Sequence, residues 1–172
     1  MKVLKFGGTS VGSAQRMKEV AKLITDGERK IVVLSAMSGT TNTLVEISDY
    51  LYKKNPEGAN EIINKLESKY RQHIDELFAT PEYKQKGLEL IKSHFDYIRS
   101  YTKDLFTLFE EKVVLAQGEL ISTAMMNYYL RTRMPSPIRS ISRTSSRFSW
   151  NCIRMLRFIS LRGTSAATPT AR

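Results

Sequence analysis

The sequence predicts an α/β fold built on a parallel sheet, and three features of its first quarter carry that prediction. Residues 2–6 and 30–35 are short apolar runs of strand length, and an amphipathic segment lies between them. A strand, a helix and a second strand this close together form a βαβ unit, whose two strands run parallel. Each of the two runs is also followed at once by a loop of glycine and hydroxyl residues.

The first helix is predicted over residues 13–25, because apolar side chains recur there at the spacing of one helical face. These side chains are Met17, Val20, Ala21 and Ile24. Ser13 has the side chain of an N-cap. Residues 30–35 are apolar almost throughout, as in a strand that a parallel sheet buries on both faces. Another helix is expected after this strand, with Leu44, Ile47 and Leu51 on one face.

Two long amphipathic helices are expected next, as a hairpin that packs on the sheet or on a partner. Residues 59–78 keep a helical period, and Thr80-Pro81 is typical of an N-cap followed by a first-turn proline. The stripe of the second helix is predicted to comprise Ile91, Phe95, Ile98, Leu105 and Leu108. The aromatic side chains of this region are expected in the core: Tyr70, Phe95, Tyr97, Tyr101 and Phe106.

A last helix is predicted to open at Glu119 and to run to about Leu130. Gly118 interrupts the apolar segment before it, and glycine is a poor helix former. A glutamate in a first helical turn ordinarily complements the helix dipole, so Glu119 alone does not indicate a site.

The composition indicates the cellular compartment of the protein and argues against a protein-bound metal. The first 20 residues carry four cations and lack a long apolar run, which argues against a signal peptide, and no segment has the length of a membrane span. The single cysteine, Cys152, fits a reducing compartment, so we expect a cytoplasmic protein. His73 and His94 have no partner at metal-ligand spacing, and we predict no protein-bound metal.

The charge changes abruptly after Leu130. Residues 1–130 hold 18 Lys+Arg and 17 Asp+Glu, whereas residues 131–172 hold nine arginines, eight serines and no lysine or acidic residue. We therefore expect a body over 1–130 and an irregular basic tail over 131–172. The tail fits a disordered arm that binds nucleic acid or an acidic surface. It fits a membrane-surface segment less well, since it has no amphipathic stripe. We favour a third interpretation, translation in a shifted reading frame.

The segment from Lys5 to Val11 has the composition of a phosphate site. Gly7 and Gly8 allow a sharp turn with exposed N–H donors, Thr9 and Ser10 add hydroxyl groups, and a helix begins shortly afterwards. Lys5, at the end of the strand, supplies a positive charge. Taken alone, the same residues are also typical of a structural glycine turn.

Three segments together resemble the aspartate kinases of the amino-acid kinase family. They are Lys5-Phe6-Gly7-Gly8-Thr9-Ser10-Val11, residues 34–42 (Leu-Ser-Ala-Met-Ser-Gly-Thr-Thr-Asn), and Gln117-Gly118-Glu119-Leu120. The resemblance covers essentially all of residues 1–130. It implies the N-terminal part of a parallel-sheet amino-acid kinase fold with a helical hairpin insertion. It also implies ATP-dependent phosphorylation of the side-chain carboxylate of L-aspartate, the first step towards lysine, threonine and methionine.

The resemblance also implies roles for individual residues. Lys5 would neutralise charge on the transferring phosphoryl group, while Gly7, Gly8 and Thr9 would bind ATP with Lys5. Ser35 and Thr41 would contact the aspartate, and Glu119 would pair with its ammonium group. Mg²⁺ would accompany the nucleotide, and the parent enzyme would be a homo-oligomer.

The sequence departs from the family after Leu130, where the second half of the catalytic domain is not readable. We therefore expect the 172-residue chain to be weakly active or inactive. Two alternatives stay open at this point. One is a nucleic-acid-binding protein that uses the basic tail, and the other is a different acyl-phosphate-forming kinase.

Overall fold

The structure is a computed structural model that describes residues 2–26 and 30–133. Two strands and five helices follow one another along the chain in this order: β1 (Lys2–Phe6), α1 (Ala14–Ile24), β2 (Lys30–Leu34), α2 (Thr40–Tyr52), α3 (Pro56–Leu77), α4 (Pro81–Ser100) and α5 (Leu108–Arg133). The mixed α/β class predicted from the sequence is confirmed, although helices make up most of the described residues.

The predicted βαβ unit is present. Strands β1 and β2 pair in parallel with Lys2 opposite Lys30 and Phe6 opposite Leu34, and α1 connects them. The Ser13 hydroxyl accepts a hydrogen bond of 3.3 Å from the backbone N–H of Arg16, which confirms the predicted N-cap. Both strands therefore end at the same edge of the sheet, as a parallel pair requires.

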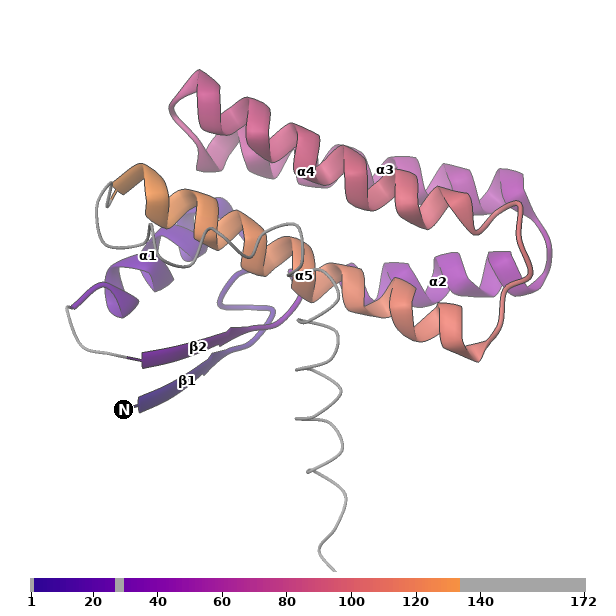
Figure 1. The fold of residues 1–172 in the computed structure, drawn as a ribbon, viewed down its shortest axis with the longest axis horizontal. Helices are drawn as coiled ribbons and strands as arrows, with labels where there is room; N and C mark the ends of the chain where they lie inside the picture. Colours follow the sequence, from indigo (N-terminus) through magenta and orange to yellow (C-terminus); the bar gives the residue numbers. More distant parts are fainter. Residues whose placement is uncertain (1, 27–29, 134–172) are drawn as a thin grey trace, which may run out of the picture. The chain divides into compact units, whose positions relative to one another are not determined.

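Helices α2 to α5 form a four-helix bundle. Each helix packs against its neighbour in the chain, and α5 closes the bundle by packing against α2. In Figure 1 the four helices run back and forth beside the strand pair. Between α3 and α4, the guanidinium of Arg99 donates to the Asn64 side chain at 2.7 Å and also to the carboxylate of Glu67. The hairpin of α3 and α4 thus packs mainly on other helices and not, as one prediction had it, on the sheet.

The interior of the bundle is apolar. Its largest fully buried side chains are Leu44, Ile47, Ile63, Tyr70, Ile74, Leu77, Ile91, Phe95, Ile98, Ile121 and Met125. Tyr70, Phe95 and Phe106 are in the core as predicted, whereas Tyr97 is 46% exposed and Tyr101 is half-buried. Among the described residues, no helix is long and apolar enough to cross a membrane.

Two predictions about the last helices are wrong. Helix α4 ends at Ser100, so Leu105 and Leu108 do not continue its stripe, and both are largely exposed. No helix opens at Glu119, because α5 is one continuous helix that already begins at Leu108. Its packing on several sides explains why Gly118 does not break it: α5 contacts α1, α2, α4 and β2, and tertiary contacts outweigh the low helix propensity of one glycine.

The predicted tail lies outside the described residues from position 134 onward. Helix α5 continues past the predicted boundary at Leu130 and includes Arg131 and Arg133. The two-stranded sheet is incompletely covered. Val3 and its cross-strand partner Ile31 are 64% and 46% exposed, although strands of parallel sheets are normally buried on both faces.

Candidate functional site

Two loops leave the strand pair at its carboxyl edge. The first loop (residues 7–13) joins β1 to α1, and the second loop (residues 35–39) joins β2 to α2. Backbone pairing continues to this edge, because the N–H of Ser35 donates to the carbonyl of Phe6 at 3.0 Å. In open α/β sheets the carboxyl edge is the place where ligands bind.

The first loop is fixed by contacts close by in the chain. The N–H of Ser10 donates to the Gly7 carbonyl at 2.9 Å, and the Arg16 guanidinium donates to the Thr9 carbonyl at 2.8 Å. Val11 anchors the loop in the core, where it is fully buried. Lys5 and Thr9 remain exposed beside this ordered turn. The loop therefore presents its lysine and its hydroxyl group to solvent from a fixed backbone.

The glycines of the first loop have different structural roles. A Cβ on Gly8 would lie 2.8 Å from the Ala36 carbonyl oxygen, and one on Gly12 would lie 3.1 Å from Cβ of Ser38. A Cβ on Gly7 would meet nothing within 4 Å. Gly8 and Gly12 thus let the two loops touch, whereas the space beside Gly7 is open to a ligand.

The second loop is held by residues distant in the sequence. Gly39 has a φ of 82°, a left-handed conformation that favours glycine, and it forms the N-cap of α2. The Lys69 ammonium of α3 donates to the Ser38 carbonyl at 3.0 Å. Sequence reasoning missed Lys69, because a lysine on the polar face of a long helix carries no local signal.

Helix α5 approaches the second loop at Gly118. A Cβ on this glycine would lie 2.6 Å from Cβ of Ala36 and 3.1 Å from Cγ2 of Thr40, so only glycine permits this approach. Glu119, the next residue, is half-buried. Gly118 therefore brings the backbone that carries Glu119 to the second loop.

Tyr70 ties these elements together from within the core. Its hydroxyl lies 3.0 Å from Oγ1 of Thr40, the first residue of α2, and it also interacts with Ser122 of α5. Burial, with a smaller contribution from the nearby Glu119 carboxylate, raises the pKa of Tyr70 to about 12, and the interactions with Thr40 and Ser122 oppose this shift. The phenol therefore stays neutral. Like Lys69, this residue was missed as part of the site, since its position in the apolar stripe indicates only a core residue.

The side chains predicted to bind ligand form no hydrogen bonds with other described residues. Within residues 2–26 and 30–133, this holds for Lys5, Ser35, Thr41 and Glu119. The backbone segments that carry them converge, since the first loop touches the second loop and the second loop touches α5. The four polar side chains are therefore candidates for ligand contacts on segments that meet near the carboxyl edge of the sheet.

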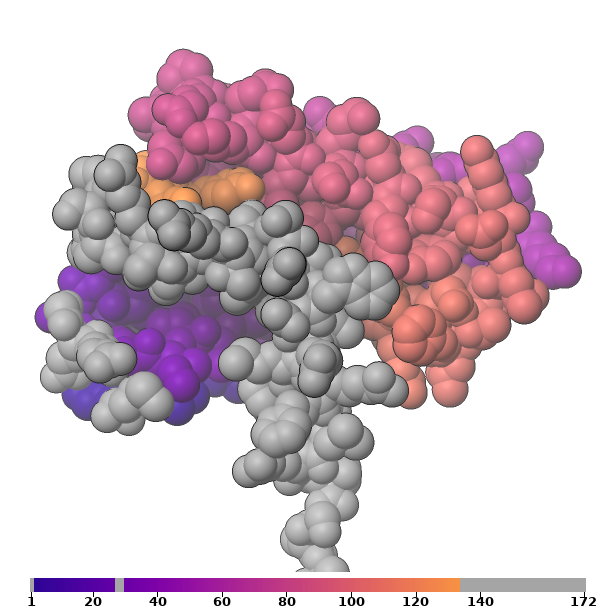
Figure 2. Space-filling view, in the orientation of Figure 1, coloured from indigo at the N-terminus to yellow at the C-terminus, as the bar shows by residue number. Residues whose placement is uncertain are grey.

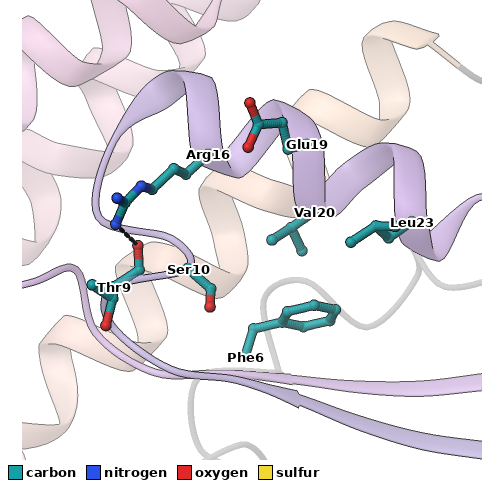
Figure 3. A pocket seen from close by; sticks show the side chains of 7 residues that line it. All are labelled: Phe6, Thr9, Ser10, Arg16, Glu19, Val20 and Leu23. Atoms are coloured by element: carbon teal, nitrogen blue, oxygen red, sulfur yellow. Dashed lines mark hydrogen bonds between the residues drawn. The ribbon is translucent and has the colours of Figure 1, made fainter.

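A cavity of about 310 Å³ opens beside the first loop, between that loop and α1. Figure 3 shows Phe6, Val20 and Leu23 on one side of it, with Thr9, Ser10, Arg16 and Glu19 around the rest. The cavity lies on the side of the first loop that faces α1. Thr9 is one of the polar residues at its rim, so the cavity overlaps the predicted phosphate site.

The described residues offer no cage for a metal ion. No group of three or more His, Cys, Asp or Glu side chains in this part of the chain could hold one. His73 is buried with Nε2 unpartnered, and Nδ1 of His94 lies 2.7 Å from the Gln117 side-chain oxygen. Burial lowers the pKa of both histidines, that of His73 to about 4.

Comparison with known proteins identifies relatives of this chain. A family model described as the amino acid kinase family matches residues 1–158, which reaches beyond the predicted boundary at Leu130. Aspartokinase 1, chloroplastic, of Arabidopsis thaliana is 35% identical over 134 residues, which are 76% of this chain and 23% of that protein. The aspartokinase of Chlamydia trachomatis is 32% identical over 132 residues, 76% of this chain and 28% of that protein.

A solved structure shows the same arrangement of elements. Aspartokinase III of E. coli, in complex with aspartate and ADP, superposes with a TM-score of 0.63 and 27% identity. The match covers 77% of this chain and 29% of that one. The chain thus spans about a quarter of the length of the curated relatives it matches.

Proposed function

Since this chain belongs to the amino acid kinase family, we propose that it forms the N-terminal part of the catalytic domain of an aspartate kinase. The observation that carries the proposal is the set of unpartnered side chains Lys5, Ser35, Thr41 and Glu119 on converging segments. The aspartokinase relatives and the aspartate- and ADP-bound structure of one of them support the choice of substrates.

The reaction transfers the γ-phosphoryl group of ATP to a side-chain carboxylate oxygen of L-aspartate. A bond forms between that oxygen and the γ-phosphorus, and the bond to the bridging oxygen of ADP breaks, which gives aspartyl phosphate and ADP. Such a transfer requires mainly positioning and positive charge on the equatorial oxygens. Lys5 supplies this charge, and the open backbone at Gly7 with the Thr9 hydroxyl binds the phosphates.

The second loop and α5 bind the amino acid. Ser35 and Thr41 donate hydroxyl groups to the aspartate, and the Glu119 carboxylate pairs with its ammonium group. Gly8 donates its backbone N–H to the phosphates. Because it has no side chain, it also allows the first loop to pack against the second loop. Mg²⁺ neutralises the phosphates when bound. The residues present fit an ion carried by the nucleotide, since the described part of the chain provides no acidic cluster for it.

The test is ADP release by the 172-residue chain with MgATP, with and without L-aspartate. We expect little or no turnover, because the chain spans only about a quarter of its relatives. Equilibrium binding of L-aspartate and MgADP, measured by calorimetry, is therefore the second readout. Glu119→Gln is expected to weaken aspartate binding about tenfold, as loss of one charge-assisted hydrogen bond does.

Lys5→Ala is expected to weaken MgADP binding and to abolish any aspartate-dependent ADP release. The matched control is Lys22→Ala, which removes an exposed lysine of α1. If the chain binds neither ligand, or if both lysine variants behave alike, the site assignment is wrong.

The match to the amino acid kinase family does not identify the molecule that accepts the phosphoryl group. A different acyl-phosphate-forming kinase of this family would use the same phosphate loop with another carboxylate. A binding screen of L-aspartate against L-glutamate and N-acetyl-L-glutamate separates the two, and preference for either glutamate compound would overturn the aspartate assignment. Nucleic-acid binding by the basic tail and a cytoplasmic location both stay predictions.

A further inference from the structure

The turn of α5 that carries Gly118 and Glu119 is also held from α4. Nδ1 of His94, on α4, lies 2.7 Å from the side-chain oxygen of Gln117. Gln117 directly precedes Gly118 in α5, and only 3% of it is exposed. Figure 2 shows the surfaces of α4 and α5 meeting along part of their length on the face in view. His94 therefore makes a polar contact between the two helices beside the residue proposed to bind the substrate ammonium group.

The direction of this hydrogen bond follows from the other bond of the Gln117 side chain. Its Nε2 donates to the Val113 carbonyl at 2.9 Å. The amide oxygen is thus the atom that faces His94, and an amide oxygen only accepts hydrogen bonds. Nδ1 must carry the proton, because the hydrogen bond at a ring nitrogen selects the tautomer. Burial lowers the pKa of His94, although the bond with Gln117 opposes this shift, so the ring is neutral at pH 7.

Helix geometry connects this contact with Glu119. Successive residues of an α-helix are separated by a rotation of about 100° and a rise of about 1.5 Å. Gln117 is held by α4, whereas Gly118 approaches the second loop, where an added Cβ would lie 2.6 Å from Cβ of Ala36. Two adjacent residues of α5 are thus fixed by two different neighbours. Together these contacts set the rotation of the helix about its axis at Glu119.

From these contacts we propose that His94 is a positioning residue, which through Gln117 sets the direction in which the Glu119 carboxylate meets the ammonium group of L-aspartate. The inference rests on the function proposed above, in which Glu119 binds that group. Without a donor at position 94, the oxygen of Gln117 loses its hydrogen bond while it is buried. An unpaired buried acceptor is unfavourable, so α5 would turn to hydrate it and would carry Glu119 with it.

The first test is binding of L-aspartate to the 172-residue chain at pH 7, measured by calorimetry. His94→Leu removes the donor and is expected to weaken this binding about fivefold, less than the tenfold loss expected for Glu119→Gln, with MgADP affinity unchanged. His94→Asn keeps a side-chain nitrogen as far from Cα, in bonds, as Nδ1 is, and this nitrogen donates. We expect it to restore the affinity to within about twofold of the parent chain, and failure to do so would overturn the proposal.

A double-mutant cycle tests whether His94 acts through Glu119. Residues that act through one another are not additive, so His94→Leu has little left to remove once the Glu119 charge is gone. In a Glu119→Gln chain it is expected to weaken aspartate binding by less than about twofold further. A full further loss of about fivefold would show that the two residues act independently, which would contradict the proposal.

The matched control is Ile98→Val, which changes a fully buried apolar residue one turn further along α4. It lowers stability by removing a buried methylene group, but it leaves the bond between His94 and Gln117 intact. We expect its affinity for L-aspartate to equal that of the parent chain. If Ile98→Val weakens binding as much as His94→Leu does, general destabilisation explains both results and the proposal is wrong.

NMR spectroscopy separates failure of this inference from failure of the proposed function. The ¹⁵N resonances of the His94 ring should show the proton on Nδ1 at pH 7. His94→Leu should shift the amide resonances of Gly118, Glu119 and Ala36, whereas Ile98→Val should not. If a chain with these properties binds no L-aspartate, the proposed function is overturned, while the role of His94 in setting the rotation of α5 stands. A ring proton on Nε2, or unchanged amide resonances in His94→Leu, would overturn the inference whatever the binding result.

Discussion

The two loops at the carboxyl edge have similar composition but are stabilised in different ways. The first loop is fixed by its own backbone, by the Ser13 cap and by Arg16, all within a few residues of it. The second loop also has local bonds, such as that from the Thr40 N–H to the Met37 carbonyl at 3.0 Å. It differs in its additional contacts with distant residues, namely the bond from Lys69 of α3 and the approach of α5 at Gly118.

This difference separates what each loop contributes. The hydrogen bonds that shape the first loop lie within residues 7–17, although Gly8 and Gly12 also pack on the second loop. Its proposed phosphate-binding geometry is therefore set mainly by local contacts. The second loop acquires its shape from a helix and a glycine that lie 30 to 80 residues away. Substitutions in the bundle should therefore disturb amino-acid binding before they disturb nucleotide binding.

The largest expected effect is that of Gly118→Ala. Helix propensity alone predicts stabilisation by about 1 kcal/mol. The added Cβ would lie 2.6 Å from Cβ of Ala36, and overpacking of this kind outweighs the gain, so we expect a net loss of about 2 to 3 kcal/mol. Urea denaturation measures this change in the free energy of unfolding.

The control for this substitution is Gly7→Ala, whose Cβ would meet nothing within 4 Å. We expect it to change stability by less than about 0.5 kcal/mol. If Gly118→Ala instead stabilises the protein, α5 does not need this close contact with the second loop. The proposed dependence of the second loop on distant residues would then be wrong.

Acid is expected to have the next largest effect, through His73 of α3. Burial lowers its folded-state pKa to about 4 from 6.5; Glu76 opposes this shift, whereas Lys69 and Lys18 add to it. Between these values the unfolded chain binds a proton that the folded chain does not. Stability is therefore lost as the pH falls below 6.5, by about 2 kcal/mol at pH 5 relative to pH 7.

The pH effect is measured by urea denaturation at pH 7 and pH 5 in the parent chain and in His73→Gln. The variant lacks this ionisable group, so its loss of stability between the two pH values should be about 2 kcal/mol smaller. Equal losses in both proteins would assign the acid sensitivity to other groups.

The smallest expected effect is that of Tyr70→Phe, which removes the hydroxyl bonded to Thr40. We expect a loss of about 1 kcal/mol, the net contribution of one buried hydrogen bond. NMR chemical shifts should change in the second loop and not in the first. The matched substitution Arg16→Ala removes the bond to the Thr9 carbonyl and should give the opposite pattern.

Local features of the sequence account for the parts of the fold that were predicted correctly. The two strands, the Ser13 cap and the first-turn proline of α4 depend on neighbouring residues only. Helix α5 was divided at Gly118 because its packing on α1, α2, α4 and β2 leaves it no single apolar face, so it lacks the period that identifies surface helices.

The candidate site was predictable to a similar extent. The roles of Lys5 and Glu119, which the resemblance implies, stay predictions, whereas the contributions of Lys69, Tyr70 and Gly118 come from tertiary contacts. A lysine, a tyrosine and a glycine in helices have ordinary structural explanations in a single sequence. Their relation to the second loop exists only once α3 and α5 are packed.

The order of helices in the bundle has a consequence for the folding pathway. Helices α2, α3 and α4 each contact the next helix in the chain, whereas α5 also packs on α1, β2 and α2, which lie far from it in the sequence. The contacts between successive helices favour fast folding of α2 to α4, and the docking of α5 on distant segments carries the largest entropic cost of loop closure. We expect α5 to dock late, so that the edge with the second loop and Glu119 is completed last. Gly118→Ala should then mainly accelerate unfolding and leave the refolding rate nearly unchanged in stopped-flow experiments.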